Sequence, residues 1–215
     1  MRHRIIALIL IAFSHFGAAA DSAWEPVEEV LAVVGSTPIL LSDVELAELV
    51  RLVDREPDED EATYRSRLLD ARIRLEIEFR DIEDGGLLFR LELDPKRARE
   101  TLIERAGGEQ LLLGSFAEKG LVEADFDELV LRATAVDAFV QQRLRPRITV
   151  NMDEIEAAYQ QLLVDEIATS DEPVPPLAQV REQLHQLLVE RKLNDEIERW
   201  IERAEDRQEV LRFSR

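Results

Sequence analysis

The sequence contains no cysteine, and this absence excludes several kinds of site. Disulfide bonds, thiol nucleophiles, cysteine-ligated metals and a lipid-modified cysteine after a signal peptide are all ruled out. Histidine is nearly as scarce, with His3, His15 and His185 as the three present. Two of them precede the expected signal cleavage, so too few histidines remain for a serine triad or a histidine-bound metal. We therefore expect no catalytic residues, no metal and no cofactor.

Basic residues are few beside acidic ones, with 27 lysines and arginines against 46 aspartates and glutamates and a net charge of −19. So acidic a surface repels phosphate backbones and anionic lipid headgroups, so we expect no nucleic acid and no direct lipid binding. The acidic run from Asp58 to Glu61 lacks the spaced ligands and central glycine of a calcium loop and is expected to be a solvated charge run. Most basic residues are arginines, so ion-pair networks along acidic helices are predicted.

The sequence also lacks an apolar run long enough for a transmembrane helix, which needs roughly twenty residues. An apolar stretch from Ile5 to Phe16 follows Arg2 and Arg4 and leads into three alanines. A basic start, a short apolar run and small residues are typical of a cleaved signal peptide. We predict that residues 1–20 are removed and that the mature chain, which starts near Asp21, is periplasmic.

Apolar residues recurring at steps of three and four predict helices along most of the remaining chain. The clearest stripe runs from Tyr64 to Ile82 and ends at a Gly-Gly pair. Local signals mark further helix starts: Asp94 with Pro95 suits a cap followed by a first-turn proline, and Asn151 with Glu154 suits a capping box. Other helices are expected to begin with caps at Ser42 and Asp125, and one long helix is expected over residues 177–207.

Two short apolar runs around a Gly-Ser turn, "VLAVVGSTPILL", predict a β-hairpin near the mature N-terminus. Two strands alone are barely stable in water, and a further candidate strand, Val210 to Phe213, lies near the other end. Pro38 cannot donate to a neighbouring strand, so it suits the outer edge and leaves the first strand free to pair with the C-terminal one. We predict a mainly α fold whose small antiparallel sheet joins the N- and C-terminal strands.

Four segments, taken in order, resemble the SurA-like periplasmic chaperones, which are relatives of the parvulin-type prolyl isomerases. They are "VLAVVGSTPILLSDVEL", "GLVEADFDELV", "RPRITVNMDEIEAAYQ" and the terminal "PLAQVREQLHQLLVERKLNDEIERWIERAEDRQEVLRF". Members of this family usually carry one or two isomerase domains before the terminal helix. Here residues 160–176 leave too little chain for such a domain. The resemblance therefore implies the chaperone core alone, without enzymatic activity.

The resemblance also implies an organisation: a signal peptide at 1–20, a helical domain like the SurA N-terminal domain at 21–164, a linker at 165–176, and a C-terminal helix and strand at 177–215 that pack back on the helical domain. It implies ATP-independent holding of unfolded outer-membrane or secreted proteins, chiefly β-barrel precursors, in an apolar groove. Two apolar stretches are candidates for this groove, the first of which alternates as an extended strand does. The candidate client-binding residues are Leu87, Phe89, Leu91, Leu93, Leu111, Leu112 and Phe116.

Other interpretations stay open at this stage. The same apolar residues also suit the interior of the domain itself. The chain can instead be a dedicated subunit of an envelope or export assembly system that binds one folded partner. A prolyl isomerase is disfavoured because there is no room for the catalytic domain. Exchange of the C-terminal helix between two copies would give a dimer.

Overall fold

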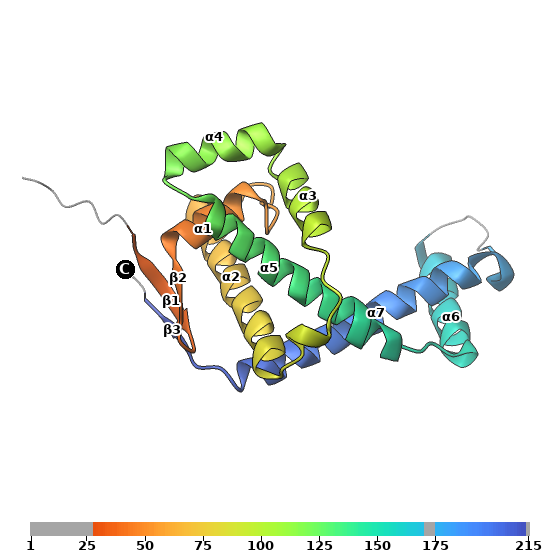
Figure 1. Ribbon diagram of the computed structural model, residues 1–215. Coiled ribbons are helices and arrows are strands. Elements are labelled where there is room, and N and C mark those ends of the chain that lie inside the picture. The colour runs from red at the N-terminus through yellow and green to blue at the C-terminus, as the bar shows by residue number, and fades with distance from the viewer. Residues whose placement is uncertain (1–27, 170–174, 214–215) are drawn as a thin grey trace, which may run out of the picture.

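The computed structural model describes residues 28–169 and 175–213, which form a mainly helical molecule with one small sheet (Figure 1). Within these residues there are seven α-helices and three strands, which confirms the predicted fold class. The predicted signal peptide lies outside the described residues. Among the helices that the structure describes, none is long and apolar enough to cross a membrane.

The sheet joins the two ends of the described chain. Strands β1 (Val30–Val34) and β2 (Thr37–Leu40) form the predicted hairpin, and β3 (Val210–Arg212) pairs antiparallel with β1, giving the order β2-β1-β3. Val33 lies opposite both Pro38 and Leu211, so the proline occupies the outer strand as expected. Gly35 supplies the positive φ of 58° that the turn requires. The third strand stabilises a hairpin that would be marginal alone.

The main body is built around α2 (Glu61–Asp84), which packs against α1 (Leu41–Leu49) and α5 (Glu123–Phe139). The predicted stripe of α2 is buried from Tyr64 to Ile82, and Asp60 caps the helix by accepting from the Thr63 amide at 2.9 Å. Ser42 does not cap α1. Instead the Asp43 carboxylate accepts from the Leu40 amide at 2.8 Å, because the helix begins at Leu41.

Helices α3 (Pro95–Arg105) and α4 (Glu109–Lys119) lie on the same side of the main body as α5 (Figure 1). The predicted cap is confirmed, since Asp94 accepts from the Arg97 amide at 3.1 Å and Pro95 occupies the first turn. Gly107 and Gly108 both have positive φ and turn the chain sharply between the two helices. Helix α5 begins at Glu123, and Asp125 reaches back to the Val122 amide rather than starting the helix.

The chain then forms a helical hairpin that extends to one side of the main body (Figure 1). Helix α6 (Met152–Thr169) begins with the predicted capping box, in which Asn151 and Glu154 exchange two hydrogen bonds of 2.9 Å. It runs into the segment predicted as a linker, so its polar C-terminal end is helical up to Thr169. Helix α7 (Leu177–Glu205) packs against α6 and then returns along α2 toward β3.

The segment 87–93 is not a strand, contrary to the sequence prediction. Residues Leu88–Arg90 form a turn of 3-10 helix, and only the stretch after it is extended. The leucines of this segment pack against a cluster that contains Phe139, Trp200 and Ile201, and no strand lies beside them in the described chain. The backbone of this segment has no neighbouring strand to pair with, so the burial of its leucine side chains decides its conformation.

Candidate functional site

The predicted client-binding residues lie in two separate places. Leu87, Leu91 and Leu93 face the cluster around Trp200 on α7, and Leu91 is only 9% exposed. Leu112 and Phe116 on α4 are 3% and 5% exposed and face a second cluster between α1 and α5. These residues are therefore core residues in this conformation and do not form one groove.

Two of the predicted residues are open to solvent. Phe89 is 95% exposed at the top of the 3-10 turn, and Leu111 is 64% exposed on α4. Most of the surface of both side chains is therefore in contact with solvent. Single exposed apolar side chains are common at protein surfaces, so Phe89 is free for a contact but does not by itself mark one.

A cavity of 490 Å³ lies between α3 and α5, where the sequence predicted no site. Its floor is apolar and is formed by alanine and leucine side chains. The walls carry charged and polar groups, and the extended chain after the 3-10 turn closes one end. The floor residues are Leu52, Ala98, Leu102, Ala133 and Ala138.

The two walls of the cavity have different charges. On α3, Arg97, Thr101 and Arg105 follow one another at successive turns, and on α5 Asp137 and Gln141 do the same. Eight residues of helix span about 12 Å, which is the length of about four residues of extended chain. Within the described part of the chain, Arg97 and Arg105 form no ion pair, so both guanidinium groups are available to a ligand.

A local irregularity of α5 positions the end of this cavity. The helix passes into a π-helical turn at Val140–Leu144, which places Gln142 beside the extended chain. The Gln142 side-chain amide donates to the Glu92 carbonyl at 2.8 Å, and its oxygen accepts from the Glu92 amide at 3.1 Å. These reciprocal bonds hold the extended chain as a neighbouring strand would. Single π-helical turns are frequent at functional sites.

A largely buried ion pair joins α5, which lines the cavity, to α2. Arg132 on α5 donates to Glu76 on α2 at 2.6 Å, and its guanidinium lies over the Phe79 ring at 5.2 Å. Next to this pair on α2, burial raises the pKa of Glu78 above its ordinary value, although Arg74 acts in the opposite direction. The α2–α5 contact therefore combines apolar packing with paired charges, and it makes a firm support for the α5 wall.

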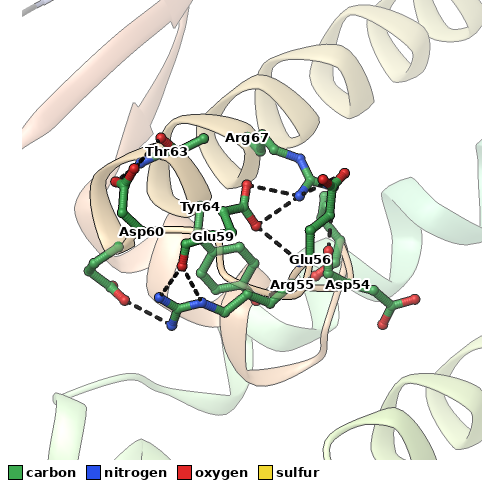
Figure 2. A network of polar contacts seen from close by, with 10 residues as sticks. Asp54, Arg55, Glu56, Glu59, Asp60, Thr63, Tyr64 and Arg67 are labelled. Carbon is green, nitrogen blue, oxygen red and sulfur yellow. Dashed lines mark hydrogen bonds and ion pairs between the residues drawn. The ribbon is translucent and has the colours of Figure 1, made fainter.

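The acidic run before α2 is an ion-pair network rather than a ligand site (Figure 2). Arg67 donates to both carboxylate oxygens of Glu59 at 2.9 Å, and this hydrogen bonding lowers the pKa of Glu59. Arg55 bridges the Glu59 carbonyl and the Glu61 carboxylate from the other side. Among the residues that the structure describes, no group of three or more acidic or histidine side chains could hold a metal ion. The network therefore fixes the loop that leads into α2.

No protein-family model matches the sequence, and no curated protein is significantly similar to it. The geometry is therefore the main guide to function. The cavity was missed in the sequence because its residues come from Leu52, the extended chain before α3, the helices α3 and α5, and the π-helical turn after α5. Alanine, threonine and arginine at these positions have no distinctive local pattern.

Proposed function

We propose that this chain is an ATP-independent periplasmic chaperone of the SurA-like kind, which holds unfolded envelope proteins and above all outer-membrane β-barrel precursors. The observation that carries the proposal is the cavity between α3 and α5, with its apolar floor and its charged walls. A floor of this kind accepts apolar side chains of an unfolded segment, while the walls provide polar groups for its backbone and charged residues.

The size of the cavity suits short segments rather than whole domains. Its volume of 490 Å³ is within the range of small-ligand sites, and its length fits about four residues of extended chain. Binding so short a segment gives little energy beyond the loss of translational and chain entropy, so each contact is weak and reversible. A holding chaperone needs this property, because a client must leave in order to fold.

Two features of the chain support this proposal over an enzyme. The connection between α6 and α7, where the resembled family carries isomerase domains, spans only residues 170–176. His185 is the one histidine in the described part of the chain, and it lies on α7 outside the cavity. In a prolyl-peptide isomerisation assay, we expect the rate with the protein to equal the uncatalysed rate. Clear acceleration would contradict the proposal.

The exposed Phe89 favours one second candidate, a dedicated subunit of an envelope or export assembly system. An almost fully exposed phenylalanine on an ordered turn suits a fixed contact with one folded partner. Affinity capture from a periplasmic extract separates the two functions. A single partner at equal stoichiometry, lost in Phe89→Ser, would support the subunit, whereas many unfolded clients retained in Phe89→Ser support the chaperone.

A cavity-filling pair of variants tests the proposed site. Ala133 lies on the cavity floor, and Ala133→Leu adds an isopropyl group to its Cβ in that space. Ala62→Leu on the exposed first turn of α2 is the matched control. We expect Ala133→Leu to suppress aggregation of a denatured β-barrel protein less well at equal concentration, with Ala62→Leu unchanged. Equal suppression by both folded variants would show that the cavity does not bind clients.

A further inference from the structure

We propose that helix α4 is a displaceable occupant of the client-binding surface and that an amphipathic client segment takes its place. This inference rests on the proposed chaperone function and extends it beyond the cavity. The client segment is defined by what α4 itself presents: a leucine and an aromatic residue one helical turn apart, as in Leu112 and Phe116.

Helix α4 is held less firmly than its neighbours. It has eleven residues, and Leu112 and Phe116 are its only buried side chains. Within the described residues, no side chain of α4 forms an ion pair or a hydrogen bond, whereas each of the other α-helices has at least one ion pair to another element. Its attachment therefore depends on two apolar side chains.

The sequence of α4 also favours release. Gly108 and Gly120 flank it with φ values of 114° and 70°, and Gly114 lies in its middle. A glycine inside a helix costs stability relative to alanine because the unfolded chain is freer. An isolated helix of this length is marginal in water, so α4 loses its helical structure once it leaves the surface.

The surface beneath α4 suits an apolar client. It is formed by α1 and α5, and the Phe116 ring meets Phe126 edge to face at a centroid distance of 6.1 Å. Leu46, Val50 and Leu129 complete this part of the cluster, so removal of α4 uncovers a continuous apolar area.

The same surface is continuous with the cavity. Leu102 belongs to both the cavity floor and the cluster under α4, and Leu52 lines the cavity while packing against that cluster. A client segment that enters the cavity can thus extend onto the surface that α4 occupies without crossing a polar boundary. The exposed Leu111 and Leu113 show that α4 carries apolar residues on its outer side as well, as an unfolded client segment does.

Gly114→Ala tests the inference without creating a clash. No atom lies within 4 Å of a Cβ placed at Gly114, and the residue is not in the positive φ region. Alanine stabilises the helix and hence the docked state, so the affinity for a fluorescently labelled, urea-denatured β-barrel protein is expected to fall about two- to fivefold. Asn194→Ala, at an exposed position of α7, raises helix propensity by a similar amount and is expected to leave the affinity unchanged.

Hydrogen exchange provides the second measurement. In the wild type, saturating client is expected to speed exchange of the α4 amides and to slow exchange in α5. Gly114→Ala alone is expected to slow exchange in α4. Unchanged affinity in Gly114→Ala, or α4 amides that the client protects, would overturn the inference while the chaperone function stands. Exchange of α4 between two copies, seen as self-association, would also overturn it. No client binding by the wild type would instead remove the proposed function together with the inference.

Discussion

Replacement of Trp200 is expected to show that α7 is an integral part of the core. Trp200 is buried on α7, and its indole N–H donates to Asp81 on α2 at 2.7 Å. Its ring also lies 4.5 Å from the Phe139 ring of α5, measured between centroids. One side chain therefore connects three helices that are far apart in the sequence. It is also close to the point where α7 leads into β3.

The size of the effect follows from these contacts. Trp200→Ala removes a large buried side chain, and such changes cost about 3–5 kcal/mol of the free energy of unfolding. Trp200→Phe keeps most of the ring packing and loses the hydrogen bond. Hydrogen bonds to charged groups contribute about 1.5–3 kcal/mol. Asp81 keeps its ion pair with Arg207, so we expect the Phe variant to lose about 1–2 kcal/mol.

Urea unfolding followed by far-ultraviolet circular dichroism measures the free energy of unfolding of both variants, because this signal reports helix content and does not depend on Trp200 fluorescence. A double-mutant cycle with Phe139→Leu then isolates the ring contact, for which we expect a coupling energy of about 0.5–1.5 kcal/mol. A loss below about 1 kcal/mol in Trp200→Ala would refute the reasoning, since it is less than burial of the ring alone accounts for.

Three further predictions concern separate parts of the fold. Burial raises the pKa of Glu78, so this carboxyl binds more protons in the folded protein than in the unfolded chain. Lowering the pH from about 7 to about 5 should therefore stabilise the wild type relative to Glu78→Gln. Thermal unfolding of both proteins at several pH values measures the difference in stability, and a difference that does not change with pH would contradict the prediction. Arg67→Ala removes both hydrogen bonds to Glu59, so a glutamate-specific protease should cleave the loop before α2 faster than in the wild type. Equal cleavage rates would show that the bonds between Arg67 and Glu59 do not order this loop. Deletion of residues 210–215 removes β3 and should lower the urea midpoint clearly, whereas deletion of 214–215 should not; equal midpoints would show that β3 adds no stability.

Much of the fold follows from local signals in the sequence. The Asn151 and Glu154 box, the Asp94 cap and the β3 pairing were predicted because each depends on a few neighbouring residues or on one strong constraint such as Pro38. The segment 87–93 was predicted wrongly because its leucines are buried against Phe139 and Trp200, which lie about fifty and more than a hundred residues away in the sequence. Tertiary packing overrides a local pattern in such a case.

The candidate site could not be predicted for a related reason. Whether Leu111 or Leu112 faces solvent depends on how α4 sits on α1 and α5, and the run of three leucines gives no preference. The cavity depends on the spacing between α3 and α5, and on the π-helical turn that places Gln142 beside Glu92. Neither feature has a signature in residues that are adjacent in the sequence.

Light scattering of a denatured outer-membrane β-barrel protein tests the central claim most directly. The client is diluted from urea into buffer at physiological salt without ATP, alone or with the chain from Asp21 onward. We expect aggregation to be suppressed at ratios near one chain per client, with no difference when ATP is added. Aggregation at the rate of the client alone, with a protein sample shown to be folded by circular dichroism, would contradict the proposed function.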